Sequence, residues 1–216
     1  MFDCTSISKF GHLNDMKYYE NKSGGNRNMR TDIMVDIETL GTKTGATIFQ
    51  IAAASFDITT GEVKDTVNLT GDIAKYDTLA VDGSTLKWWL DTDADLLKTL
   101  LSGGTLTEKE LLTSLLSWMY AQAPDNKDVY LWGNGILFDN VKISDLCAKH
   151  DVSYPIFYRN DRDVRTILEL ASLKSGLTEK ELRASVQAEN ERKHDAFDDV
   201  MFQIRLVQKC YEIVMK

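Results

Sequence analysis

The feature that most constrains this chain is the run Asp-Ile-Met-Val-Asp-Ile-Glu-Thr at positions 32–39. Its β-branched and apolar residues favour a strand, in which successive side chains point to opposite faces of a sheet. Three apolar residues then share one face: Ile33, Val35 and Ile37. Asp36 and Glu38 share the other face, and at about 3.3 Å per residue their carboxylates project roughly 6–7 Å apart. We therefore expect a core strand that carries two acids side by side.

Two interpretations of this pair are open. Taken alone, Asp36 and Glu38 are most simply the solvated face of a strand. If further acids converged on them, the group could hold two hard cations about 3.5–4 Å apart. The later chain supplies candidates, namely Asp139 after a Gly-Asn-Gly turn, and His194 and Asp199 at the start of the last helical pattern. Each acid alone could complement a helix dipole, so only the set as a whole favours a site.

Composition sets the class of protein. With 216 residues, of which 43% are hydrophobic, the chain can bury a core and is most simply one domain. No run approaches the roughly 20 apolar residues of a membrane span, and the sequence has no signal-peptide pattern. We expect a cytoplasmic, intracellular protein without a membrane partner. The three cysteines are scattered and indicate neither a disulfide framework nor a zinc site.

The net charge of −8 argues against a protein that holds nucleic acid through a large basic surface. It does not exclude an enzyme that cuts nucleic acid. Metal ions would cancel part of the charge of an acidic site, and a local basic path would then suffice. Candidates for that path are Lys43, Arg159, Arg162, Arg165, Arg192 and Lys193.

Periodicity and turn residues predict the order of the elements. Residues 1–30 show little apolar periodicity, which predicts a poorly ordered extension before a domain at 31–216. Short turns between the first strands indicate an antiparallel meander, with strands at 32–39, 46–57 and 62–70. Helices are expected from Ser84, from Asp93 and from a capping box at Thr107. The remaining elements are a strand at 128–132, helices at 138–150 and 164–173, a second capping box at Thr178, and a last helix from about 195.

Taken together, these motifs resemble the DEDDh 3′→5′ exonucleases, a family with the RNase H-like fold. The resemblance covers about residues 31–214 and is closest to the branch with phage exonuclease A and the RNase T-like exoribonucleases. It is carried by five motifs in order: Val35–Thr39, Ser84–Trp89, Trp132–Asn140, Arg162–Thr166 and His194–Asp199. It implies an α/β fold with a mixed sheet of five to six strands flanked by helices. It is also compatible with an intracellular protein encoded by a phage.

The resemblance also implies an activity. Similar enzymes release nucleoside monophosphates from single-stranded 3′ ends, with DNA narrowly favoured over RNA through the phage branch. Asp36, Glu38, Asp139 and Asp199 would hold two divalent ions, Mg²⁺ or Mn²⁺, with Asp36 bridging both. His194 would be the general base, because histidine can accept a proton at neutral pH. Dimers occur among similar enzymes, so a homodimer is an allowed arrangement.

Substrate contacts are expected from Thr39, Leu40, Trp88, Asn134 and Arg165. Adjacent helical residues point about 100° apart, so Trp88 and Trp89 should not face the same surface. Trp89 shares a helical stripe with Leu86 and Leu90 and is expected in the core. Trp88 is then the candidate to stack on a nucleobase.

Two other functions remain open at this point. One is a catalytically silent module that keeps the fold and binds nucleic acid. The complete set of four acids with His194 argues against it, because decay would be expected to remove a ligand. The other is a small phosphodiesterase-like hydrolase that acts on nucleotides.

Overall fold

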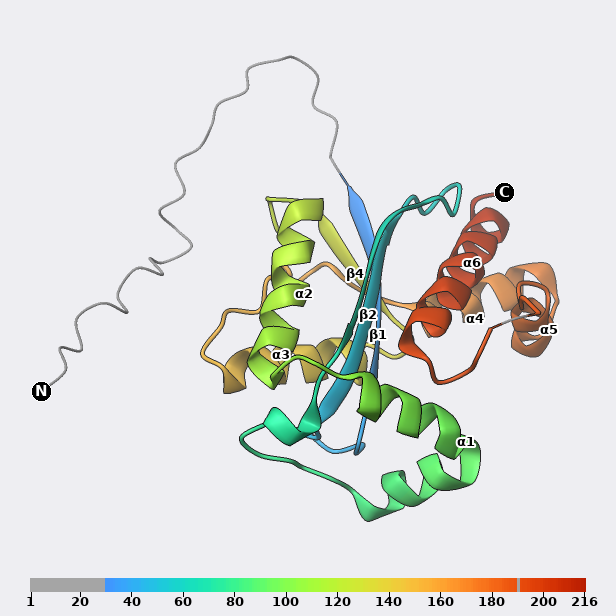
Figure 1. Ribbon diagram of the computed structural model, residues 1–216. Helices are drawn as coiled ribbons and strands as arrows, with labels where there is room; N and C mark the ends of the chain where they lie inside the picture. Colours follow the sequence, from blue (N-terminus) through green and yellow to red (C-terminus); the bar gives the residue numbers. More distant parts are fainter. Residues whose placement is uncertain (1–29, 190) are drawn as a thin grey trace, which may run out of the picture.

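The structure is a computed structural model that describes residues 30–189 and 191–216 (Figure 1). The predicted extension at 1–30 lies, apart from Arg30, outside the described residues. Within the described part, five strands form one sheet in the order β3-β2-β1-β4-β5. The strands are β1 (Thr31–Thr39), β2 (Ile48–Phe56), β3 (Val63–Thr70), β4 (Val129–Gly133) and β5 (Asp161–Asp163).

The sheet is mixed, as predicted. β1 pairs antiparallel with β2, which pairs antiparallel with β3. On its other edge β1 runs parallel to β4, and β4 runs parallel to β5. The antiparallel meander followed by parallel strands is therefore confirmed. β2 begins two residues later than predicted, because the amides of Ala46 and Thr47 bond instead to the carbonyls of Lys43 and Ala80 in the neighbouring turns.

Helices cover both faces of the sheet (Figure 1). On one face lie α2 (Glu108–Gln122) and α3 (Asp139–Lys149), and on the other lie α4 (Val164–Ser175), α5 (Glu179–Ala184) and α6 (Ala196–Met215). Ile33, Val35 and Ile37 pack in the core under α2 and α3, whereas Met34 packs with residues of α4 and α6. The predicted alternation of β1 therefore holds, and it points Asp36 and Glu38 toward α6.

A further helix, α1 (Gly83–Gly103), crosses the end of the sheet where β1 finishes (Figure 1). The two helices expected from Ser84 and Asp93 are confirmed as two helical stretches of α1, which meet at Asp93, whose φ of −156° is not helical. The Asp93 carboxylate accepts the Leu96 amide at 2.9 Å and so caps the second stretch, as predicted. Its N-cap is Asp82 rather than Ser84, because the Asp82 carboxylate accepts bonds from the Ser84 amide and hydroxyl. α1 packs through a small core cluster of Leu40, Phe49, Trp89, Leu96, Leu97 and Leu100.

α2 and α5 begin with the same four residues, Thr-Glu-Lys-Glu, and both predicted capping boxes form. Thr107 and Thr178 each accept a bond from the amide three residues on, and Glu110 and Glu181 each bond back to the cap. A 3₁₀ turn, Ile73–Lys75, links β3 to the segment before α1. Among the described residues, no helix is both long enough and apolar enough to cross a membrane.

Candidate metal and active site

Three elements bring four acids to one place. Asp36 and Glu38 come from β1, Asp139 is the first residue of α3, and Asp199 lies in the first turn of α6. Burial raises the pKa of Asp36 well above its usual range, and the charges of the other three acids raise it further. The four carboxylates predicted to form the site therefore lie within electrostatic reach of one another.

The electrostatics of this cluster disfavour its charged form. Burial, together with the charges of Asp199, Asp139 and Asp195, raises the pKa of Glu38 to about 9. Burial raises the pKa of Asp139 to about 7, although backbone amides and the charge of Arg165 oppose the shift. The pKa of Asp199 is also raised, mainly by burial. Four oxygen ligands that repel one another in this way suit hard divalent cations, which would remove the repulsion.

His194 completes the cluster. It precedes α6 with a φ of 67°, in the left-handed region, and its backbone amide donates to Asp199 Oδ2 at 3.1 Å. Ligand atoms of Glu38, His194 and Asp199 lie within 4.8 Å of one another. The His194 ring meets the edge of the Trp88 ring at a centroid distance of 4.8 Å. His194 is therefore held against both the acids and α1.

The first turn of α6 contains three acids with different neighbours. Asp195 is the N-cap and accepts bonds from the amides of Phe197 and Asp198. Asp198 accepts the Arg192 amide at 2.8 Å, so its side chain stabilises the segment before the helix. Of the three, only Asp199 lines the same pocket as Asp36. The helix-dipole explanation thus fits Asp195 and Asp198 but not Asp199.

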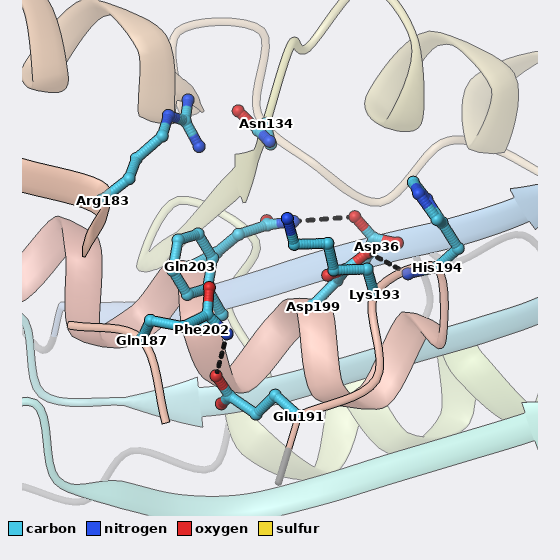
Figure 2. A pocket seen from close by; sticks show the side chains of 10 residues that line it. All are labelled: Asp36, Asn134, Arg183, Gln187, Glu191, Lys193, His194, Asp199, Phe202 and Gln203. Carbon is cyan, nitrogen blue, oxygen red and sulfur yellow. Dashed lines mark hydrogen bonds between the residues drawn. The ribbon is translucent and has the colours of Figure 1, made fainter. Parts of the chain in front are cut away.

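Sequence reasoning missed Gln203, which donates from Nε2 to Asp36 Oδ1 at 2.8 Å. Figure 2 shows this bond in a pocket, named here the polar pocket, which is lined by Asp36, Asn134, Arg183, Gln187, Glu191, Lys193, His194, Asp199, Phe202 and Gln203. Gln203 is only 2% exposed. The available signal was its position, because it lies four residues after Asp199 and interrupts the apolar stripe of α6.

A second pocket, named here the tryptophan pocket, borders Glu38. It is lined by Ile37, Glu38, Thr39, Thr42, Ser84, Thr85, Trp88, Trp89 and Phe138. Trp89 lies in the core and Trp88 at the surface, as expected. The two rings nevertheless meet edge to face at 5.3 Å, and both line this pocket. Trp88 is 44% exposed, whereas Trp89 is buried and donates from Nε1 to the Thr39 carbonyl at 3.1 Å.

The predicted helical stripe of Leu86, Trp89 and Leu90 is wrong. Leu86 and Leu90 are 37% and 57% exposed, so they do not form a core face with it. Trp89 packs instead on Phe49, with ring centroids 5.7 Å apart, and on the leucines that follow the break in α1. These leucines lie after Asp93, where a second helix was predicted to begin, so the helical spacing of the first stretch does not extend to them.

The other predicted substrate residues divide between pocket and core. Thr39 lines the tryptophan pocket and Asn134 lines the polar pocket. Leu40 is 3% exposed and belongs to the core cluster under α1, so the structure corrects its expected place on the substrate surface. Arg165 lines neither pocket, but its guanidinium lies over Gly135 and its charge reaches Asp139.

The Gly-Asn-Gly turn sets the position of Asp139. Gly135 has a φ of 115°, and a Cβ there would lie 3.0 Å from the Arg165 guanidinium carbon. A residue with a side chain would therefore be strained by both its backbone and its neighbour. Asp163 caps α4 and accepts the Ile136 amide at 3.3 Å, which ties the turn to β5.

Of the cations proposed as a basic path, few approach the acids. Arg192 forms two bonds with Asp93, at 2.9 and 2.6 Å. Arg162 bonds to the carbonyls of Arg159 and Asp161 and lies over Tyr130. Lys193 lines the polar pocket beside Asp36.

Comparisons with solved structures show the same fold. Cell-death related nuclease 4 (CRN-4) superimposes with a TM-score of 0.64 at 13% identity, covering 84% of this chain and 64% of that one. The nuclease domain of 3′hExo, a DEDDh family member bound to rAMP, gives 0.58 at 14% identity, covering 84% and 92%. The zinc-bound complex of E. coli exonuclease I with single-stranded DNA gives 0.58 at 14% identity, covering 86% and 40%. The chain thus spans slightly less than two thirds of the length of CRN-4 and about two fifths of the length of exonuclease I.

Sequence comparison identifies the family. No curated protein sequence matches the chain significantly. The model of the Rv2179c-like 3′-5′ exoribonuclease domain matches residues 31–211, which include all four acids and His194. The resemblance to DEDDh exonucleases and their RNase H-like fold is thereby confirmed. Because the matched model spans most of its length, the chain belongs to the Rv2179c-like 3′-5′ exoribonuclease domain family.

Proposed function

We propose that this chain is a metal-dependent 3′→5′ exonuclease that releases nucleoside monophosphates from single-stranded 3′ ends. The observation that carries the proposal is the convergence of Asp36, Glu38, Asp139 and Asp199 from three elements, with His194 beside two of them. Such a set suits phosphodiester hydrolysis, which needs an attacking water, neutral charge around the phosphate and a stabilised leaving oxygen. Membership of an exoribonuclease domain family supports the same reaction.

The carboxylates of Asp36, Glu38, Asp139 and Asp199 would hold two divalent ions, Mg²⁺ or Mn²⁺. When bound, these ions would supply Lewis-acid activation and charge neutralisation at the scissile phosphate. His194 would accept a proton from the attacking water, since its ring lies beside Glu38 and Asp199. The edge of Trp88 would limit rotation of that ring. Arg165 would favour the charged form of Asp139, which its own charge already stabilises.

The tryptophan pocket would receive the terminal nucleotide. It borders Glu38 directly, and its polar residues are hydroxyl-bearing side chains such as Thr42, Ser84 and Thr85. Trp88 offers an exposed aromatic ring on which a base could stack, whatever its identity. This arrangement would make cleavage tolerant of sequence.

We propose that the enzyme prefers RNA over DNA. The resemblance to the phage branch ranked DNA narrowly first, but the family model that covers residues 31–211 is described as an exoribonuclease domain. The fold alone does not favour either sugar, since one solved neighbour is bound to rAMP and another to single-stranded DNA. The family description is therefore the observation that favours RNA.

The test compares end-labelled RNA and DNA oligomers of the same sequence, with Mn²⁺ or EDTA. We expect stepwise shortening from the 3′ end, faster on RNA, which is lost with EDTA and in Asp36→Ala. A mobility shift without shortening would favour the silent binding module. Hydrolysis of mononucleotide esters alone would favour the small phosphodiesterase.

His194 and Asp36 should fail in different ways. His194→Ala should lower turnover by about 10²–10⁴-fold, because a general base is lost, while the Mn²⁺ midpoint of activity stays near that of the wild type. Asp36→Ala should abolish turnover and metal binding together. An unimpaired His194→Ala enzyme would refute the assignment of the base, and a shifted Mn²⁺ midpoint would make His194 a metal ligand instead.

A further inference from the structure

The polar pocket does not end at the acids. It continues into an adjoining groove, named here the α5 groove, which is lined by Glu179, Lys180, Arg183, Ala184, Gln187 and Lys193. Arg183, Gln187 and Lys193 line both cavities. A continuous depression therefore leads from Asp36 and Asp199 along α5.

The groove carries positive charge on a chain whose net charge is −8. Its cations are Lys180, Arg183 and Lys193, and none of them forms an ion pair within the described residues. Glu191, which lines the polar pocket but not the α5 groove, forms an ion pair with Arg205. Glu179 is then the one acid lining the α5 groove. Three cations opposed by one acid leave the groove attractive to anions.

The cations also point along the route to the acids. In Figure 2 the Arg183 side chain extends from α5 toward Asn134, and Lys193 lies beside Asp36. The tryptophan pocket borders Glu38 and contains two tryptophan rings. It shares no lining residue with the polar pocket or the α5 groove. One surface near the acids is therefore suited to a base and another to backbone phosphates.

We propose that Lys180, Arg183 and Lys193 form a track that binds the phosphates upstream of the terminal nucleotide. This inference rests on the proposed function and extends it. The track binds the phosphodiester backbone that RNA and DNA share, so it sets how affinity depends on strand length rather than on the sugar. Lys180 lines the α5 groove but not the polar pocket, so we expect a dinucleotide bound at the acids not to contact it.

The chain contains its own control for Lys180. Lys109 and Lys180 occupy the same position in the two Thr-Glu-Lys-Glu helix starts, and both side chains are exposed. Lys109→Ala and Lys180→Ala therefore remove the same charge from the same kind of helix turn. Only Lys180 lines the groove. Equal melting temperatures for the two variants would show that both keep the fold.

The experiment measures binding of a labelled strand of about 12 nucleotides by fluorescence anisotropy over a range of salt. A His194→Ala background slows cutting enough for binding to be measured. We expect Lys180→Ala to weaken binding roughly threefold or more, and to lower the slope of log affinity against log salt by about 0.7. Lys109→Ala should change neither quantity. Identical affinities and slopes in the two variants, or no strand binding at all, overturn the track.

A change of opposite sign adds a second check. Glu179→Gln removes the acid of the groove, so it should tighten strand binding while Lys180→Ala weakens it. With His194 present, both variants should hydrolyse a dinucleotide as the wild type does. Failure of the wild type to hydrolyse either substrate would contradict the proposed function, whereas normal hydrolysis with unchanged strand binding would contradict the track alone.

Discussion

Gln203 illustrates how one amide can set the geometry of a carboxylate. Its Nε2 donates to Asp36 Oδ1, while its own Oε1 is buried and has no partner among the described residues. A buried polar atom without a partner is costly, so its presence beside Asp36 indicates a functional constraint. Residues in this position orient metal ligands without touching the metal.

At this scale we predict that Gln203→Met weakens metal binding. The change keeps the volume but removes the bond to Asp36, so the Mn²⁺ midpoint of activity should rise about tenfold. Gln208→Met, five residues along the same helix and packed on Gly61, is the matched control and should leave the midpoint unchanged. An unaltered midpoint in Gln203→Met would mean that Asp36 is positioned by the strand alone.

Between elements, the segment before α6 depends on α1. The Arg192 guanidinium bonds Asp93 at the break in α1, and the His194 ring rests on Trp88 from the same helix. Asp93 also accepts the Leu96 amide at 2.9 Å, so the break, the ion pair and the second half of α1 share one carboxylate. The position of His194 is therefore set by a helix about 100 residues earlier in the chain.

We predict that Arg192→Gln lowers turnover about three- to tenfold without changing the Mn²⁺ midpoint, because His194 loses one restraint while the acids stay in place. The guanidinium is largely exposed, so the effect on global stability should be small. Asp93→Asn keeps an oxygen for Leu96 and should have the same effect. The double variant should be no worse than either single one, since the two act through one bond.

The control is the other two-bond Arg–Asp pair, Arg30 with Asp32, at the opposite end of β1. Arg30→Gln leaves the buried Asp32 without its cation, so it should lower the melting temperature but leave turnover intact. Equal turnover losses in Arg192→Gln and Arg30→Gln would show that the activity follows stability rather than the position of His194.

For the whole molecule, repulsion between the acids of the site lowers the stability of the fold. Strands and helices from both halves of the chain bring four acids together, and the charges of Glu38, Asp139 and Asp199 all raise the pKa of Asp36. A fold that assembles such a group is less stable without cations than with them. Metal binding and folding stability should therefore be coupled.

We predict that Mn²⁺ at about 100 times its dissociation constant stabilises the protein by about 2.7 kcal/mol, which raises the melting temperature by roughly 5–10 °C. Asp139→Asn should melt no lower than the wild type in EDTA, because one repelling charge is gone, and should lose most of the Mn²⁺ shift. Differential scanning calorimetry measures both. An equal Mn²⁺ shift in the variant would place the ions elsewhere.

The same charges set the pH dependence in EDTA. The folded pKa values of Glu38 and Asp139, about 9 and 7, lie above their ordinary values of 4.5 and 3.8. The folded protein binds these protons more tightly than the unfolded chain, so their stabilisation is complete at low pH and is lost as pH rises toward 9. Urea unfolding from pH 5 to 8 should show decreasing stability, and saturating Mn²⁺ should reduce the slope. A flat profile in EDTA would contradict this coupling.

Local chemistry made much of this fold predictable. The alternation in β1, the two capping boxes and the glycines before Asp139 act over a few residues, so the sequence determined them directly. The same local reasoning placed Asp36 and Glu38 on one face, and the order of the motifs identified the family. The sequence also identified Asp139 and Asp199 as candidate metal ligands before their contacts were known.

Only the tertiary structure decided the remaining geometry. Leu40 lies in the core and both tryptophans share one pocket because α1 folds over the end of the sheet. Gln203 meets Asp36 across 167 positions, and Arg183 lines the polar pocket from a six-residue helix. Such contacts depend on how elements pack rather than on local periodicity. Long-range packing, which no short window of sequence records, therefore determined what surrounds the acids.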